Sequence, residues 1–130
     1  MKIISILLVL LSICFVSNLL AQDQIKPFWF VMLMKGPNRG HDSTTAAKIQ
    51  AGHMNHMQVM ANKGILKVAG PFGEEGDWRG IFILDCPTRE EAIEWLKKDP
   101  AIQAGRLAYE IKMLYTAPQG SFAPSTPKKE

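Results

Sequence analysis

The chain has 130 residues, with 15 basic and 12 acidic side chains and a formal net charge of +3. No block of basic residues exists beyond the terminal Lys128–Lys129, so the electrostatic pattern typical of nucleic-acid binding is missing and we expect no nucleic-acid partner. Once the N-terminal segment discussed next is set aside, the remaining length allows one small domain at most.

Residues 1–21 have the pattern of a secretory signal peptide. One lysine precedes an almost unbroken apolar run up to Leu20, and the small residue Ala21 is followed by a polar linker at 22–27. We expect cleavage after Ala21 and a secreted or periplasmic protein without membrane attachment; the alternative is an anchor retained in the membrane, because the run is nearly long enough to span a bilayer. Cleavage leaves Cys86 as the single cysteine, which excludes an intramolecular disulfide.

Four segments have the composition of strands. Residues 28–35 are aromatic and apolar and follow a proline, which predicts a buried strand. Residues 65–69 and 78–85 are short apolar runs bounded by glycine-rich segments, and 107–115 alternates in hydrophobicity. Residues 116–130 contain three prolines among polar residues and are predicted to be a disordered, proline-rich tail.

Two helices are predicted between these strands. The first begins at a cap formed by Ser43 or Thr44 and ends at Gly64, a residue suited to the left-handed conformation that follows a helix. The second begins at Thr88, which forms a capping-box pattern with the glutamate three residues later. It ends near Asp99, because the following proline disfavours helical geometry in the residue before it.

The resulting order, βαββαβ, is that of the ferredoxin-like α+β fold with an antiparallel sheet. In this topology the third strand lies between the first and second, and the first lies between the third and fourth. The two helices run antiparallel on one face of the sheet. His53 on the first helix and Asp99 at the end of the second are therefore expected at the same edge of the domain.

The segment "HMNHMQVMANKGILKVAGP", followed by "GIFILDCPTREEAIEWLKKDPAIQAGRLAYEIKML", resembles a YCII-related (YciI-like) domain. The matching positions are a histidine near the start of the first helix, a G-x-L-x-x-A-G-P strand and a D-P-x-x-x-A-G element, here His53, residues 64–71 and residues 99–105. The resemblance covers a domain from residue 28 to residue 115. This sequence departs from the pattern at His56, where the family often has an aromatic or apolar residue, and in its signal peptide.

The resemblance implies a dimeric α+β barrel, in which the sheets of two subunits pack together, and hence a homodimer. It also implies a candidate active site made by a histidine and an aspartate, which correspond to His53 and Asp99. The family has no agreed substrate, so the resemblance supplies neither a reaction nor a cofactor, and we expect none of the latter.

His53 is the candidate general acid or base, because imidazole titrates near neutral pH, and Asp99 would orient its ring. No nucleophile stands at a recognisable spacing: Ser43 lacks a glycine elbow, and Cys86 is expected to be a small packing residue. The pair thus favours isomerase or lyase-type chemistry on a small organic molecule over acyl transfer. The structural alternative is that Asp99 braces the turn at Pro100 while His53 bonds a backbone carbonyl.

The same helix also raises the possibility of a metal site. His53 and His56 lie three residues apart, His41 could be a third ligand, and interspersed methionines (Met54, Met57 and Met60) would suit Cu(I). A methionine stripe at helical spacing is more often core. The sequence therefore predicts an exported YCII-like protein and leaves two hypotheses open. One is acid/base chemistry on a small molecule by His53 and Asp99, and the alternative is a non-catalytic protein that binds a small ligand or copper.

Overall fold

The computed structural model describes residues 25–116, and the compact unit Pro27–Leu114 contains the helices and the site described below. The predicted signal peptide, residues 22–24 of the predicted linker and residues 117–130 of the predicted tail lie outside the described residues. No helix within residues 25–116 combines the length and the hydropathy that crossing a bilayer requires.

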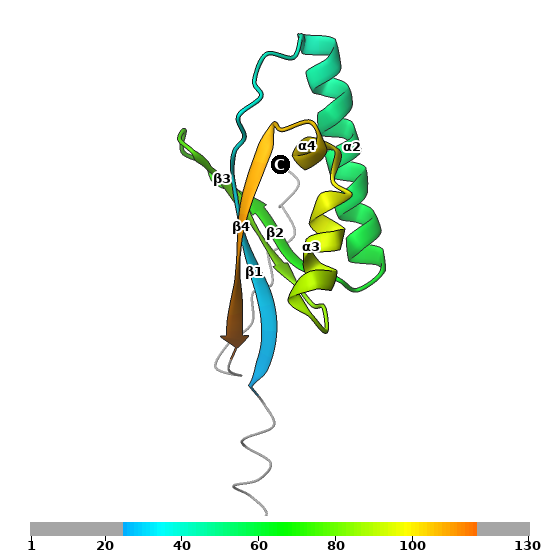
Figure 1. The fold of residues 1–130 in the computed structure, drawn as a ribbon, viewed down its shortest axis with the longest axis vertical. Helices are drawn as coiled ribbons and strands as arrows, with labels where there is room; N and C mark the ends of the chain where they lie inside the picture. The colour runs from blue at the N-terminus through cyan, green and yellow to red at the C-terminus, as the bar shows by residue number, and fades with distance from the viewer. Residues whose placement is uncertain (1–24, 117–130) are drawn as a thin grey trace, which may run out of the picture. The chain divides into compact units, whose positions relative to one another are not determined.

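Four strands form one sheet in the order β2-β3-β1-β4: β1 (Lys26–Lys35), β2 (Leu66–Pro71), β3 (Trp78–Leu84) and β4 (Leu107–Thr116). β3 is antiparallel to both β1 and β2, and β4 runs opposite to β1 (Figure 1). The helices α2 (Ser43–Asn62), α3 (Arg89–Lys97) and α4 (Pro100–Gln103) all lie on one face of this sheet (Figure 1). The predicted βαββαβ order and strand arrangement are confirmed, with α4 as an additional element.

The core lies between this sheet and the helices. Alternate residues of β1 are buried, as the two-residue period of a strand requires, and they meet the buried residues of β3 and one side of α2 and α3. Each large apolar side chain buried in this way contributes roughly 1.5–3 kcal/mol to folding. The principal members of this core are Trp29, Val31, Leu33, Met60, Phe82, Leu84, Ala92 and Leu96.

The start of α2 corrects one prediction, because its cap is Asp42 instead of Ser43 or Thr44. One carboxylate oxygen of Asp42 accepts the backbone N–H of Thr45 at 2.9 Å, and the other accepts the Thr45 hydroxyl at 2.7 Å. These hydrogen bonds to the charged form lower the pKa of Asp42 below its usual value. The predicted end is confirmed, since Gly64 follows the helix with a φ of 71°.

The second helical region also differs from its prediction. Thr88 caps α3 as expected, accepting the backbone N–H of Glu91 at 3.2 Å. The helix α3 ends at Lys97, close to Asp99 as predicted, but Asp99 is also the N-cap of a separate helix, α4, with Pro100 in its first turn. Proline suits the first turn of a helix because its missing N–H would have no partner there. Pro100 therefore starts a helix here as well as ending one.

Candidate functional site

His53 and Asp99 are in direct contact. His53 lies on α2 and is buried, and its ring nitrogen Nδ1 is 2.7 Å from Oδ2 of Asp99. A carboxylate can only accept a hydrogen bond, so Nδ1 carries the proton and donates the hydrogen bond to Asp99. The structure thus brings together the two residues that the topology placed at one edge, and the backbone-carbonyl alternative for His53 is wrong.

Asp99 has two tasks at once. Its side chain is fully buried, and Oδ1 accepts the backbone N–H of Ala101 at 2.8 Å while Oδ2 accepts from His53. The first bond caps α4, and the second orients the imidazole ring. The carboxylate of Asp99 is therefore fixed in direction by the backbone of α4.

A glycine allows α2 and α4 to approach closely enough for this contact. A Cβ atom at Gly52 would lie 2.9 Å from Cγ of Pro100, closer than real Cβ contacts allow. Gly52 precedes His53 in the chain, and Pro100 follows Asp99. The missing side chain at Gly52 thus lets the adjoining residues His53 and Asp99 come within hydrogen-bond distance.

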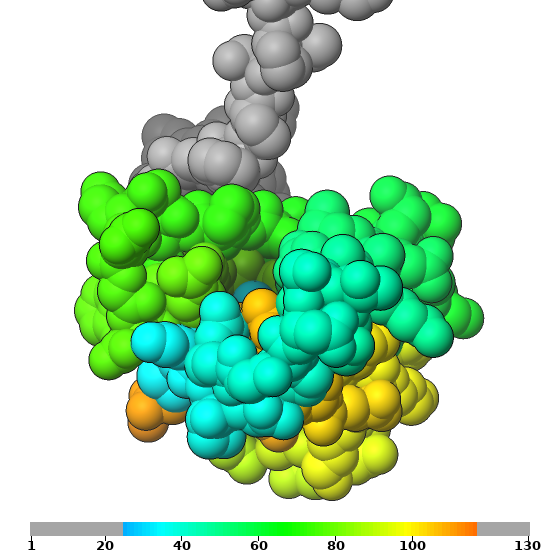
Figure 2. Space-filling model, turned by 90° about the horizontal axis from the view of Figure 1, so that it is seen from above, coloured from blue at the N-terminus to red at the C-terminus, as the bar shows by residue number. Residues whose placement is uncertain are grey.

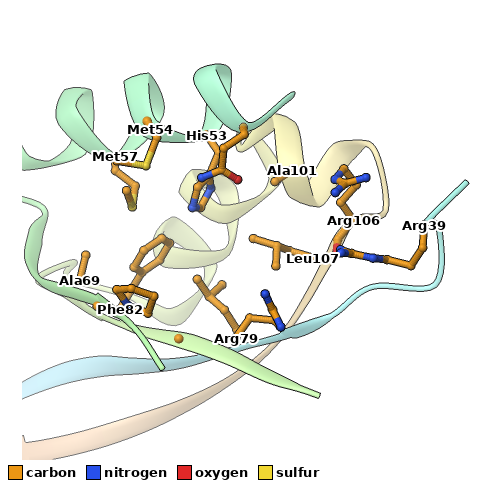
Figure 3. A pocket seen from close by; sticks show the side chains of 15 residues that line it. Arg39, His53, Met54, Met57, Ala69, Arg79, Phe82, Ala101, Arg106 and Leu107 are labelled. Carbon is orange, nitrogen blue, oxygen red and sulfur yellow. The ribbon is translucent and has the colours of Figure 1, made fainter. Parts of the chain in front are cut away.

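His53 also forms part of the wall of a pocket of about 460 Å³. Figure 2 shows the corresponding hollow between α2 and the β2–β3 segment, with the start of β4 inside it. Nδ1 is engaged by Asp99, and Nε2 has no hydrogen-bond partner among residues 25–116, so Nε2 is the nitrogen available to a ligand. The ring of Phe82 lies below the imidazole, with the two planes 21° apart and the centroids 6.0 Å apart (Figure 3).

The pocket wall contains residues from all four strands, from α2 and α4, and from two connecting segments. Besides His53 and Gln50, its side chains are apolar groups, such as Met57 and Phe82, and three arginines that the sequence reasoning did not identify. The arginines come from three separate segments, which is why no local pattern revealed them. They are Arg39 in the loop after β1, Arg79 in β3 and Arg106 just before β4.

His56 occupies a different environment from His53. Its Nε2 lies 2.9 Å from the backbone carbonyl oxygen of Trp95 on α3, and its ring is tilted against the Trp95 ring at 6.1 Å. His56 does not contribute to the pocket wall described above. It therefore connects α2 to α3, at the position where this sequence departs from the family pattern.

The potential metal ligands are distributed over several environments. Met60 is fully buried in the core, Met57 lines the pocket, and Met54 is 52% exposed at the pocket wall, so the stripe is only partly core. His41 lies in the loop before α2, where Nε2 is 3.4 Å from the side-chain amide nitrogen of Asn38. Within residues 25–116, no three histidine, cysteine, aspartate or glutamate side chains converge as a metal site would require.

Cys86 is buried at the end of β3, and its carbonyl accepts the indole N–H of Trp29 at 3.1 Å. Burial, with smaller contributions from Glu91 and Asp85, raises the pKa of the Cys86 thiol to about 11. The thiol is therefore protonated at neutral pH, which suits a packing residue and not a nucleophile.

The fold and the site define an α+β domain of the ferredoxin-like kind with a buried histidine–aspartate pair beside a pocket. The sequence matches the model of the YCII-related domain over residues 28–114, and the chain belongs to this family. The family resemblance seen in the sequence is thus confirmed. No curated protein matches the chain.

Two solved structures illustrate the fold. Muconolactone isomerase superposes with a TM-score of 0.58 and 15% identity, covering 76% of this chain and 99% of that one. A 5-chloro-2-hydroxyhydroquinone dehydrochlorinase from Burkholderia phenoliruptrix, in complex with 2,5-dihydroxybenzoquinone, has a TM-score of 0.49 and 21% identity over 65% of this chain and 90% of that one. At such identities a likeness concerns the fold alone, and the ferredoxin-like α+β class, shared with α+β barrel proteins, is confirmed.

Proposed function

We propose that the protein is an acid/base catalyst for a small organic molecule, with His53 as the proton-transfer group and Asp99 as its orienting carboxylate. The observation that carries the proposal is the 2.7 Å contact from His53 Nδ1 to a fully buried carboxylate, which leaves Nε2 available to the pocket. A paired carboxylate fixes the tautomer of the ring and stabilises the imidazolium that forms when the ring accepts a proton.

The chemistry that suits this arrangement is isomerisation or a lyase-type reaction. Nε2 of His53 removes a proton from a carbon next to a carbonyl, and the electron pair of the broken C–H bond becomes part of an enolate. Where a C=C bond of the substrate is conjugated with this enolate, the imidazolium, held by Asp99, then returns the proton to the far carbon of the dienolate to give an isomer. If the enolate instead expels a group from the next carbon, the result is elimination. Neither sequence requires a change of oxidation state in the protein.

Proton exchange at carbon tests this proposal without knowledge of the natural substrate. A panel of small carbonyl compounds with apolar bodies is incubated with the protein in D₂O, and loss of C–H signals is followed by NMR. We expect exchange that falls by about 100-fold or more in His53→Gln, as removal of a general base implies. His56→Gln is the matched control and is expected to keep the wild-type rate.

Exchange that survives in His53→Gln would contradict the assignment of His53. A compound that binds saturably in the pocket but exchanges none of its protons, across the whole panel, would favour the non-catalytic ligand-binding alternative. The copper alternative is opposed by electrostatics, because three guanidinium groups in the pocket wall disfavour a cation there. Titration of tag-free protein with Cu(I) tests it directly.

We also propose that the functional unit is a homodimer formed through the second face of the sheet. The strand residues that alternate with the core positions are themselves largely apolar, and α2, α3 and α4 all lie on the opposite face (Figure 1). Face-to-face packing with a second copy would bury this surface in the manner expected of an α+β barrel. The residues are Phe30, Met32 and Met34 on β1, Val68 on β2, and Ile81 and Ile83 on β3.

Sedimentation measures this assembly. The wild-type protein lacking residues 1–21 is expected to sediment as a dimer, and Ile83→Lys is expected to shift it to a monomer because a charge would be placed in the apolar interface. Lys48→Glu, an exposed charge change on α2 and so on the opposite side of the sheet, serves as a control for the effect of altered charge. A wild-type monomer at concentrations used for assays would overturn the proposed dimer.

We further propose that the protein is exported. It rests on the signal-peptide pattern of residues 1–21 and on cleavage after Ala21. Mass spectrometry of the protein recovered from the extracytoplasmic fraction of a bacterial host is expected to give an N-terminus at Gln22. Recovery of the full-length chain in the membrane fraction would favour the retained anchor instead.

A further inference from the structure

Three of the four arginines in the chain line the same pocket, and no lysine within residues 25–116 does. Arg39, Arg79 and Arg106 come from segments far apart in the sequence, so their meeting at one pocket is a property of the fold. The guanidinium group differs from an ammonium group in presenting a planar fork of donors, which matches carboxylate and phosphate oxygens. The composition of the wall therefore favours a planar anionic partner.

Within the described part of the chain, no acidic side chain neutralises these positive charges at the pocket. No aspartate or glutamate of residues 25–116 is among those that line it. Among residues 25–116, the ion pairs involve His53, Lys67 and Lys97, and none of the three arginines takes part in one. The one hydrogen bond from these guanidinium groups within this range runs from Arg39 Nη1 to the backbone carbonyl of Arg106, at 3.1 Å. Most of their donors are thus available to a ligand.

Close backbone contacts hold the arginine-bearing segments in place. The backbone N–H of Gly36 donates to the Arg106 carbonyl at 2.9 Å, and a Cβ at Gly36 would lie only 2.2 Å from the carbonyl oxygen of Gly105. The loop that carries Arg39 is thereby joined to the segment that carries Arg106. On the other side, a Cβ at Gly80 would lie 2.5 Å from the Gly70 carbonyl, so β2 packs tightly beside the strand residue that follows Arg79.

The pocket has a charged end and an apolar end. In Figure 3 the side chains of Arg39, Arg79 and Arg106 lie on one side of the pocket, and Met57 and Ala69 lie on the other. His53 and Phe82 lie between these two groups (Figure 3). A ligand that fits this pattern has an anionic group at one end and an apolar, flat body that can rest on the ring of Phe82.

We propose that the pocket binds small organic anions, with a carboxylate or phosphate group held by Arg39, Arg79 and Arg106 and an apolar body over Phe82. The proposal rests on the proposed function only for the statement that the body of the anion lies within reach of His53 Nε2. Binding itself needs the arginines and the apolar wall. The substrate class that follows is an organic acid or a phosphorylated compound, and a neutral carbonyl compound is a weaker ligand.

Binding of simple aromatic probes to the protein lacking residues 1–21 tests this inference. Benzoate and phenyl phosphate carry the two anionic groups on one flat body, and benzamide is the neutral counterpart of benzoate. Affinities are measured by NMR titration. We expect at least one of the two anions to bind at least about tenfold more tightly than benzamide. The anion that binds more tightly identifies the preferred group. Added salt is expected to weaken the binding of the anions but not that of benzamide.

Substitutions then locate the anionic group. Arg79→Gln and Arg106→Gln are each expected to weaken the preferred anion by about tenfold, because each removes a charge-assisted hydrogen bond. Arg89→Gln makes the same chemical change on α3, away from the pocket, and is expected to leave the affinity unchanged. Arg106→Lys, which keeps the charge but loses the fork, is expected to have an intermediate affinity.

Equal binding of benzoate and benzamide, unchanged affinity in Arg79→Gln and Arg106→Gln, or no saturable binding of either anion would each overturn the inference. His53→Gln separates it from the proposed function, because that variant is expected to bind the anion with an affinity within about twofold of wild type while losing proton exchange. Anion binding without exchange in the wild type would leave the inference supported and the acid/base proposal contradicted.

Discussion

The two histidines of α2 stand one turn apart and form hydrogen bonds of similar length, yet they differ in what they can do. His53 donates to a buried carboxylate at 2.7 Å, and His56 bonds a backbone carbonyl at 2.9 Å. A carboxylate stabilises a protonated imidazole, whereas a carbonyl mainly fixes one ring nitrogen. A hydrogen bond alone therefore does not show what a histidine can do. The kind of acceptor and the presence of a cavity beside the ring distinguish a site suited to chemistry from a structural contact.

Removal of the Asp99 carboxylate should have the largest effect on stability. Asp99→Ala leaves the Nδ1 donor of His53 without its partner and α4 without its cap, and we expect the free energy of unfolding to fall by about 3 kcal/mol. Urea denaturation measures this loss. Asp42→Ala removes the exposed cap of α2 and is expected to cost less, so equal losses in the two variants would contradict the special weight given to Asp99.

Gly52→Ala tests the close contact between α2 and α4 next to His53. An alanine inside a helix usually stabilises it, but here the new methyl group would meet the Pro100 ring, and we expect a net loss of about 1–2 kcal/mol. Ala51→Gly, at the neighbouring exposed position, measures how much the free energy of unfolding changes through helix propensity alone in this helix. A stabilising effect of Gly52→Ala would mean that α2 and α4 do not approach each other closely at this position.

His56→Phe tests the structural side of the comparison. The substitution keeps a ring beside Trp95 but removes the hydrogen bond to its carbonyl, and we expect a loss of about 1 kcal/mol in thermal or urea unfolding. Proton exchange at carbon should be unaffected. A strong loss of exchange in a folded His56→Phe protein would remove the distinction drawn between the two histidines.

The smallest expected difference between the two histidines is in the tautomer of their neutral rings, and it is measured in the wild-type protein without any substitution. Nδ1 should carry the proton in neutral His53, because its partner is a carboxylate, and Nε2 should carry it in neutral His56, because its partner is a carbonyl. Long-range proton–nitrogen NMR spectra, recorded at a pH where the spectra themselves show both rings to be neutral, distinguish the two forms. The same tautomer in both rings would contradict one of the two hydrogen bonds.

Much of the fold was predictable because its signals are local in the sequence. The apolar runs, the cap at Thr88 and the position of Gly64 each depend on a few neighbouring residues, and the βαββαβ order then fixes which strands adjoin. The same topology, with the family motif, led to the pairing of His53 with Asp99. The missed cap at Asp42 is a choice among three adjacent residues that can all serve as caps.

The rest of the site depends on contacts between distant segments. The arginines at 39, 79 and 106 share no spacing, and their convergence follows from close backbone approaches that only the folded chain displays. One regularity was available in the sequence: each of these arginines adjoins a glycine, whereas Arg89 does not. The sequence pattern does not predict α4, because a proline after Asp99 indicates the end of one helix and is equally suited to the first turn of the next.

The double use of the Asp99 carboxylate couples the chemistry of the site to the local order of one helical turn. The helix α4 has four residues, too few to be stable alone, and its cap also holds the imidazole of His53. Opening of this turn would release the ring from its fixed orientation while the sheet stayed folded, since proteins open locally at a lower cost than they unfold globally. The fraction of molecules with an oriented histidine is thus set by a small local equilibrium, which hydrogen exchange at Ala101 reports directly.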